Sequence, residues 1–292
     1  EDAAAAAGRA LAGAQARHRL DLFGGQAGVL LAGFEVARAA GDDELLARVQ
    51  GGYQRLHRSL RDGGSGLASL THRRGLHFGL TGLALTDIAA HLATGDPRPL
   101  DRAIERLADE VGVCFVTADG DMMVRDVDNN RALPYIEWGS AGVWAVVQVA
   151  ERLSRQRLLD DDQRTAFARA CSADFYVYPG LDHGRAGVMA VLSAAGDEQA
   201  GEVARQRDLL LDTLLHRDGM GFSAGDGFLR LSSDLATGAA GVALGLHCVQ
   251  HRRPFDWLPL SAPSAALLNS LPVPAADGLT PEELLVEVSR HG

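Results

Sequence analysis

Five copies of a Gly-x-x-Gly motif, each followed by an apolar segment, recur along this chain of 292 residues. The copies are Gly25/Gly28, Gly79/Gly82, Gly139/Gly142, Gly184/Gly187 and Gly238/Gly241. They stand roughly 50 residues apart, a period typical of folds that stack copies of one supersecondary unit. Because one such unit cannot bury its apolar face alone, each copy must pack against its neighbours.

Two kinds of helical segment alternate along the chain. The segments after the glycine pairs are apolar on nearly all sides for two turns, which predicts inner helices surrounded by neighbours. The segments between them are amphipathic, with apolar residues at i, i+3 and i+4 spacing, which predicts outer helices. These outer segments are residues 42–60, 98–111, 161–175 and 198–217. Such an alternation closes most naturally into two concentric rings, so we expect an all-α fold, an α/α toroid.

Three local patterns predict further elements. Residues 113–124 have an Asp-Gly turn between apolar runs, which predicts a small hairpin between two helical pairs. Residues 254–279 are rich in Pro, Ser and Ala, which predicts an irregular connection. Thr280, with Pro281 and Glu283 after it, has the pattern of an N-cap that opens a last helix.

The glycine pairs themselves have two interpretations. Glycine at a helix start permits a tight turn with positive φ and leaves the first-turn N–H groups bare, facing the mouth of the ring. The alternative is that the glycines only let helices approach closely. Both can hold at once.

The charged residues exclude several classes of chemistry. All 28 basic residues are Arg, so there is no Lys for a Walker P-loop, a kinase strand, a Schiff base or a Ser-Lys dyad. The net charge of −10 would repel a phosphate backbone, so nucleic acid is not an expected partner. Any reaction must use His, carboxylates, Tyr, Ser, Thr, Arg or Cys.

The first residues do not have the pattern of a targeting segment. It opens with Glu1, Asp2 and an Ala run, and no apolar stretch approaches about 18 residues, so we expect a soluble, cytoplasmic protein with no membrane partner. The three Cys are far apart, which argues against a disulfide framework or an evident zinc site. His247 and His251 stand four apart on one helix and would fit a two-His metal pair, although packed or solvated histidines are the plainer interpretation.

His183 is the strongest candidate for chemistry among the ten histidines. It lies in a loop directly before the fourth glycine pair, with Asp182 beside it. A loop imidazole near a carboxylate can act as a general acid or base, because an unperturbed imidazole titrates at about pH 6.5. The alternative is a histidine that caps or packs against the helix.

Two further loops carry polar residues before a glycine pair. Tyr135 and Glu137 precede the third pair, and Arg230 and Asp234 precede the fifth. Because all three loops lead into the same motif, convergence on one site is more plausible than for scattered residues. Solvated loop side chains remain the alternative.

These motifs resemble those of the LanC-like lanthionine cyclases. FLRLSSDLATGAAGVAL (228–244) is similar to the C-terminal cyclase domain of class III lanthipeptide synthetases, and PYIEWGSAG (134–142) and LDHGRAG (181–187) fit the same family. The resemblance spans residues of about 20 to 250 and implies an α/α toroid. It implies that residues 1–292 are one cyclase domain at the C-terminal end of a larger lyase-kinase-cyclase enzyme.

The resemblance also implies a reaction. Such a domain adds a Cys thiol of a precursor peptide, which has a leader and a dehydrated core, to dehydroalanine or dehydrobutyrine and so forms a thioether. His183 matches the active-site histidine of the family. Zinc-dependent members have Cys-His-Gly where this chain has Ala236-Thr237-Gly238, and their Trp-Cys-x-Gly is not found here. We therefore expect no zinc and no other cofactor, with Glu137 substituting for a family carboxylate.

Without zinc, other groups must activate the thiol. A free thiol with a pKa near 8.5 is only a few per cent thiolate at neutral pH. Arg230 and the helix-start N–H groups would supply positive potential, and His183, oriented by Asp182 or a neighbouring carboxylate, would protonate the α-carbon of the enolate.

Two other functions remain open from the sequence. Toroids of this kind also host glycoside hydrolases, for which Glu137 and Asp234 could form the carboxylate pair, although aromatic residues make up only 5% of the chain. A non-catalytic peptide-binding module is the other alternative, because lost zinc ligands can mean lost activity.

Overall fold

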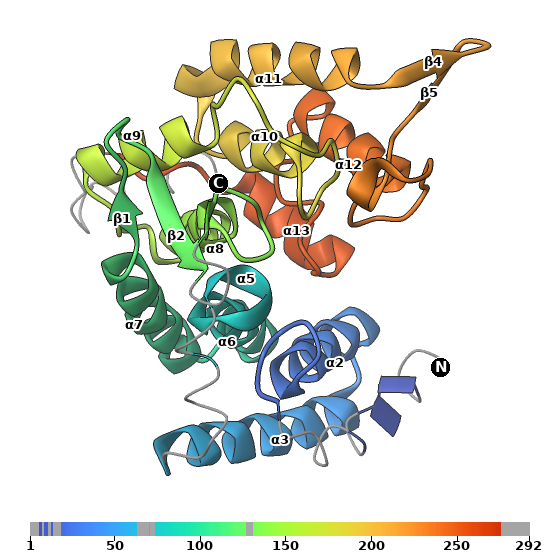
Figure 1. Ribbon diagram of the computed structural model, residues 1–292. Helices are drawn as coiled ribbons and strands as arrows, with labels where there is room; N and C mark the ends of the chain where they lie inside the picture. Colours follow the sequence, from blue (N-terminus) through green and yellow to red (C-terminus); the bar gives the residue numbers. More distant parts are fainter. Residues whose placement is uncertain are drawn as a thin grey trace, which may run out of the picture.

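The computed structural model describes residues 19–62, 74–126 and 131–275, together with residues 6, 7, 9, 10, 13 and 70. The described part is mostly helical, with two small antiparallel sheets, in agreement with the expected all-α class (Figure 1). The helix predicted to begin after Thr280 lies outside the described residues. No helix within the described ranges is both long and apolar enough to cross a membrane.

The five inner helices each begin directly after the first glycine of a pair. They are α2 (Gln26–Ala40), α6 (Leu80–Thr94), α8 (Ser140–Ser154), α10 (Arg185–Ser193) and α12 (Ala239–Gln250). Each packs on the next in chain order, from α2 to α12. The three central helices are buried over residues 80–90, 140–152 and 185–192, whereas α2 and α12 are less buried. This confirms the prediction of apolar helices surrounded by neighbours for the three central helices, but not for α2 and α12.

The outer helices follow the inner ones as predicted. They are α3 (Asp43–Arg61), α7 (Pro97–Gly112), α9 (Asp161–Ala170) and α11 (Ala200–Asp212). Each packs on the inner helix that precedes it, so the two sets form a curved double row, with α3, α7, α9 and α11 on the outside (Figure 1). Asp42, Asp96 and Asp160 cap the first three, because each side chain accepts a hydrogen bond from a first-turn backbone N–H.

Two outer segments are shorter than the sequence indicated. The third ends at Ala170 rather than near residue 175, and Cys171 caps it. The fourth begins with a 3₁₀ turn at Asp197–Gln199 and gives way to strand β4 (Leu215–Arg217) before residue 217.

Strands occur only at turns between helices in the described residues. The predicted hairpin is present: β1 (Phe115–Val116) pairs with β2 (Met122–Asp126), and Gly120 has the positive φ of 88° that its turn needs. A third strand, β3 (Arg131–Leu133), extends this sheet. The hairpin of β4 and β5 (Met220–Phe222) was not predicted, although Asp218-Gly219 with two positive φ values is a typical hairpin turn.

The expectation of an irregular connection over residues 254–279 is wrong in part. It contains a helix, α13 (Ala262–Ser270), with Pro263 in its first turn. Buried Glu35 of α2 accepts hydrogen bonds from the backbone N–H of Ser261 at 2.8 Å and from the hydroxyls of Ser261 and Ser264 at 2.6 Å each. These bonds fix α13 against α2, so residues 254–275 pack on the inner row of helices.

Apolar contacts between the two rows form the core. The indole of Trp144 on α8 stacks on Phe167 of α9, with ring centroids 6.0 Å apart, and both side chains are fully buried. Phe34 of α2 and Tyr53 of α3 form a second such pair, edge to face with ring centroids 5.5 Å apart, so aromatic contacts stabilise the packing of two outer helices on their inner partners.

Candidate functional site

The first glycine of each pair is an N-cap in extended backbone, with φ between −159° and −99°. The expectation of positive φ at these positions is therefore wrong. Space is the reason for glycine instead. A Cβ on Gly25 would lie within 3.0 Å of the backbone of Asp21, and one on Gly184 within 3.0 Å of the backbone of Tyr178 and Gly180.

The second glycine of each pair is required for a tighter contact. A Cβ on Gly142 or Gly187 would lie within 3.0 Å of the carbonyl oxygen of the residue six positions earlier, and the same holds for the other three pairs. That earlier residue is always Leu or Ile. Its side chain also covers the second glycine of the next repeat, as Leu76 does at Gly142. In each repeat, the loop therefore folds back onto the helix that follows it. The Leu or Ile side chain of that loop also packs against the second glycine of the next repeat.

The first-turn N–H groups of the inner helices are not bare, contrary to expectation. At α8 and α10 they donate to carbonyls of the preceding loop, Ala141 N–H to Pro134 at 3.0 Å and Ala186 N–H to Pro179 at 3.1 Å, and at α6 Leu80 N–H donates to the carboxylate of Glu110 at 3.1 Å. Because loop carbonyls and the Glu110 carboxylate accept from these donors, they are not free to supply positive potential at the site.

A ladder of backbone hydrogen bonds joins the five loops. It runs from Phe23 N–H to the carbonyl of His77 (3.1 Å), from His77 to Glu137 (2.8 Å), from Glu137 to Asp182 (3.3 Å), and from Asp182 to Ala236 (2.9 Å). All five residues occupy the same repeat position, five before the second glycine. The ladder therefore sets the starts of the five inner helices along one edge of the molecule.

The central part of this ladder carries the candidate site. Glu137 lies between two imidazoles: its Oε2 contacts Nε2 of His183, and its Oε1 is 3.8 Å from Nδ1 of His77. Nε2 of His77 is 3.8 Å from Oδ2 of Asp182. Glu137 is 8% exposed as a residue, while the side chains of His77, Asp182 and His183 are 14%, 22% and 27% exposed. The carboxylate is thus buried behind rings that remain partly open to solvent.

Aromatic rings surround the two imidazoles. Phe23, which is largely exposed, stacks on His77 with ring centroids 5.2 Å apart. Trp138 packs beside His183 at 5.3 Å, and the Tyr135 ring lies perpendicular to His183 at 6.4 Å. These apolar surfaces limit the access of water to the ion pairs, which strengthens the electrostatic interactions between them.

Burial raises the pKa of Asp182, and the carboxylates of Glu137 and Asp234 act in the same direction. His77 and His183 oppose the rise, because imidazolium charge beside a carboxyl favours its ionised form. The site is thus a compact group of acids and bases whose charge states depend on one another.

The other predicted site residues lie around this group in different roles. The Tyr135 hydroxyl accepts a hydrogen bond from the N–H of Val177 at 3.1 Å, and burial raises its pKa. Asp234 organises the loop before α12: its carboxylate accepts from the Ser232 hydroxyl and from Thr237 N–H, which lower its pKa to about 2. Asp234 is a loop-forming residue in this arrangement.

Arg230 is not brought to the site by any contact that the described residues show. Its backbone carbonyl accepts from Gly225 N–H at 3.0 Å in a tight loop, and its side chain is exposed. The convergence expected from the sequence therefore holds for His183, Asp182 and Glu137, with Tyr135 at the edge of the group.

His77 is the residue that the sequence analysis missed. In the sequence it has no companion histidine or cysteine at a spacing typical of metal ligands. The signal lies in the repeat: counted back from the second glycine, His77, Glu137 and Asp182 have the same position in three successive copies. A side chain at one repeat position must neighbour its counterparts in the next copies.

Glu110 of α7 holds the loop that carries His77. Its carboxylate is fully buried and accepts from the N–H groups of Gly75 at 2.7 Å and Leu80 at 3.1 Å. Burial raises its pKa to about 7, against the effect of these two hydrogen bonds and of Arg74 nearby. Outer helix α7 thus fixes the position of the loop that carries His77.

Within the residues that the structure describes, no group of three or more His, Cys, Asp or Glu side chains is arranged to hold a metal ion. The His247 and His251 rings lie 4.5 Å apart and His247 is 3.4 Å from Asp256, but Cys248 between them is buried. Burial raises the pKa of the Cys248 thiol to about 12, which keeps it protonated.

Comparison with known proteins gives one informative similarity. No protein family profile matches the chain. The chain is 32% identical over 184 residues to a protein of Streptomyces coelicolor named as a probable SapB synthase. The matched region covers 61% of this chain and 19% of that protein, so the chain spans about a fifth of the length of this relative. This chain is therefore similar to part of a protein that is named as a probable synthase.

Proposed function

We propose that this chain is a peptide cyclase that forms lanthionine or methyllanthionine thioethers without zinc. The observation that carries the proposal is the His77–Glu137–His183 row at the edge where the inner helices begin. The resemblance of the Gly-x-x-Gly loops to lanthionine cyclases and the similarity to a protein named as a synthase support it. The substrate would be a precursor peptide with a leader and a dehydrated core.

Two imidazoles divide the proton transfers of this reaction between them. His77 takes the proton of the Cys thiol, and the sulfur then forms a bond to the β-carbon of dehydroalanine or dehydrobutyrine. The π electrons of the alkene move onto the adjacent carbonyl as an enolate. His183, in its imidazolium form beside Glu137, then gives a proton to the α-carbon. One proton leaves sulfur and one reaches carbon, so the reaction balances.

Glu137 supports both steps by its position. A carboxylate in contact with one imidazole and 3.8 Å from another stabilises positive charge on either ring. Asp182 supports His77 from the opposite side. Neither carboxylate needs to touch the peptide, so both are positioning residues in this scheme.

A zinc site of the kind in zinc-dependent lanthionine cyclases does not fit this chain. Ala236 and Thr237 stand where those cyclases have Cys and His, and the alanine side chain offers no donor. In the proposed reaction the imidazoles, rather than zinc, activate the thiol.

We infer that the curved double row of helices is part of an α/α toroid, with α2 to α12 as its inner layer. We also infer that the chain is a domain of a larger polypeptide with lyase and kinase domains. The match to about a fifth of a longer protein supports this second inference.

A glycoside hydrolase is less well supported. That chemistry needs two carboxyl groups facing one cleft, one of them protonated. Asp234 has a pKa lowered to about 2 and is held by Ser232 and Thr237, so it is unsuited to be the acid. A non-catalytic peptide-binding module would share the fold but has no use for a buried carboxylate between two imidazoles.

Incubation with a dehydrated peptide that contains one Cys tests the proposal. We expect loss of the free thiol without a change in mass and formation of one stereoisomer, because spontaneous addition is slow and unselective. A panel of oligosaccharides run in parallel should remain intact. Spontaneous-rate thiol loss with a mixture of stereoisomers would leave only the binding module, and cleavage of a sugar would establish the hydrolase.

A further inference from the structure

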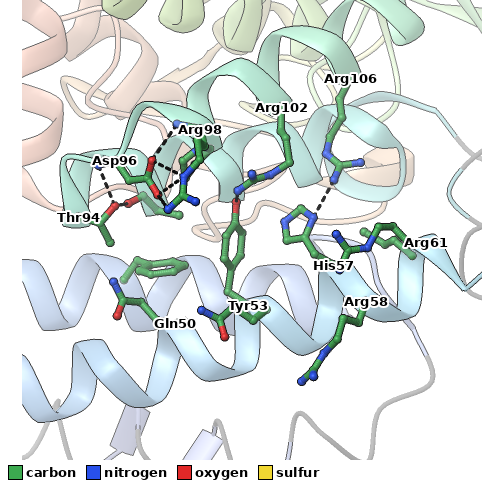
Figure 2. A pocket seen from close by; sticks show the side chains of 15 residues that line it. Gln50, Tyr53, His57, Arg58, Arg61, Thr94, Asp96, Arg98, Arg102 and Arg106 are labelled. Carbon is green, nitrogen blue, oxygen red and sulfur yellow. Dashed lines mark hydrogen bonds and ion pairs between the residues drawn. The ribbon is translucent and has the colours of Figure 1, made fainter.

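A cleft between outer helices α3 and α7 lies away from the site described above. Its volume is about 840 Å³, and Figure 2 shows that the two helices run side by side along it. Five arginines line the cleft: Arg58 and Arg61 on α3, and Arg98, Arg102 and Arg106 on α7. The proposed cyclase reaction uses none of them.

This local charge contrasts with that of the whole chain. The chain has a net charge of −10, yet the cleft concentrates arginines against one lining carboxylate, Asp96, which Arg98 engages through two nitrogens at 2.6 and 2.9 Å. Within the described ranges, Arg58 and Arg61 are exposed and have no side-chain partner. A strongly acidic molecule does not gather such a cluster for solubility, because interspersed charges would serve that purpose better.

A buried network underneath fixes the shape of the cleft floor. Asp87 of α6, 1% exposed, accepts hydrogen bonds from the Tyr53 hydroxyl and from Arg106 at 2.8 Å, and is 3.0 Å from Nε2 of His57. Arg102 donates to the Tyr53 hydroxyl at 2.8 Å, while its Nε is buried without a hydrogen-bond partner. Asp87 therefore orients two arginines but neutralises only part of the charge.

The spacing of the arginines indicates the shape of the ligand. Arg98, Arg102 and Arg106 stand at i, i+4 and i+8, so their α-carbons are about 6 Å apart along one face of α7. Carboxylates repeat at this interval on one face of a helix, and at about 6.6 Å on one face of an extended strand. A row of cations with this pitch matches a row of peptide carboxylates better than one compact anion.

We propose that this cleft binds an acidic peptide segment, laid between α3 and α7 with its carboxylates on the arginine row of α7 and on Arg58 and Arg61 of α3 opposite it. A nucleotide fits less well, because the aromatic lining residues Phe34 and Tyr53 are buried and offer no free face to a base. A lone phosphate fits less well because the N-terminus of α7 is already capped by Asp96, which accepts from Arg98 N–H at 3.0 Å. The inference does not rest on the proposed cyclase function.

Fluorescence anisotropy with the full chain tests the proposal. The probe is a labelled alanine-based peptide with Glu at every fourth position, and the reference is the same peptide with Gln. We expect the Glu peptide alone to bind, and its affinity to fall steeply between about 0.05 and 0.2 M NaCl. The double variant Arg58→Gln with Arg61→Gln should weaken binding about tenfold or more, as two lost ion pairs predict.

A second double variant provides the matched control. Arg48→Gln with Arg55→Gln removes the same charge from α3 at exposed positions outside the cleft lining, and should leave the affinity within about twofold. Equal loss in both double variants would mean non-specific attraction and overturn the proposal. Binding of inorganic phosphate or ADP without binding of the Glu peptide would overturn it also, and would assign the cleft to a phosphate ligand.

Discussion

A carboxylate between two imidazoles is the most informative arrangement at the scale of single residues. Glu137 contacts His183 and lies 3.8 Å from His77, at three loops that are far apart in the sequence. Such an arrangement needs buried charge to be compensated on both sides, since an unpaired buried carboxylate is costly. It therefore has the character of a buried, compensated charge rather than of a surface ion pair.

Replacement of His183 by Asn tests the proton donor. We expect the fold to persist, because the side chain is 27% exposed at the edge of the site, and the rate of ring closure to fall by about 10² or more. Rate and stereochemistry of the thioether should both be followed. His216→Asn, at an exposed strand position, is the control. Unchanged rate and stereochemistry in a folded His183→Asn protein would reduce His183 to a structural residue.

Replacement of His77 by Ala tests the proposed base. We expect ring closure to slow by about 10², and added imidazole to restore part of the activity, because a small base can enter the space left by the ring. His91→Ala removes a histidine that bonds the Asp96 carbonyl at 2.8 Å and should be active without imidazole. Failure of imidazole to rescue His77→Ala at any concentration would argue against a proton-transfer role.

The sequence revealed part of this site. His183, Asp182 and Glu137 were found because each stands beside a glycine pair. His77 was missed because its relation to them is one of repeat position, which sequence neighbours do not show. Arg230 was included because it is close in sequence to the fifth pair, but its loop turns the side chain to solvent. Proximity in sequence therefore predicted the loops, and only packing decided which side chains meet.

At the scale of elements, the second glycine of each repeat is a packing requirement. Gly187→Ala should lower the free energy of unfolding by more than about 2 kcal/mol, because the new methyl would lie within 3.0 Å of the Leu181 carbonyl and of the Ile136 side chain. Gly201→Ala on α11 meets no atom within 4 Å and should raise the free energy of unfolding by roughly 0.5–1 kcal/mol. Urea unfolding measures both. Equal effects would refute the packing argument.

Glu110 makes the anchoring of α6 depend on pH. Its pKa is about 7 in the folded state, raised from an ordinary value of 4.5, so between these values the folded state holds the proton more tightly than the unfolded state. The contribution of Glu110 to stability is therefore largest below pH 4.5 and declines as pH rises to about 7, by roughly 3 kcal/mol.

Unfolding at several pH values measures this effect. Glu110→Gln should flatten the decline in stability between about pH 5 and pH 7.5, because the amide does not titrate. Glu105→Gln, at an exposed position of the same helix, should keep the wild-type slope. A slope that Glu110→Gln leaves unchanged would show that other groups cause the pH dependence.

The element boundaries show where sequence patterns fail. The inner helices were predicted correctly, because each has a glycine N-cap and a long apolar run. Helix α13 was missed because its Pro and Ser suggested a loop, yet Pro263 suits a first turn, and Ser261 and Ser264 gain a buried partner in Glu35. That partner lies more than 200 residues away in the sequence. Local composition cannot reveal such a stabilising contact.

At the scale of the whole molecule, the proposed chemistry predicts a protein without stoichiometric metal. By the resemblance to lanthionine cyclases, Ala236 and Thr237 stand where zinc-dependent members have two ligands, so purified protein should contain far less than one zinc per chain. Chelators should leave ring closure unaffected. Elemental analysis measures the content. About one zinc per chain, removed together with activity by chelation, would refute metal independence.

The backbone ladder has a consequence for how such a molecule changes its chemistry. Neighbouring loops are joined through main-chain atoms, so the distance between adjacent positions does not depend on which side chains occupy them. The row from Phe23 to Ala236 is a set of five backbone positions with fixed spacing. In this chain they carry an aromatic ring, an imidazole, two carboxylates and a methyl group. Exchange of side chains at the end of the row near Ala236 can therefore add or remove metal ligands, while the backbone and the other four positions keep their geometry.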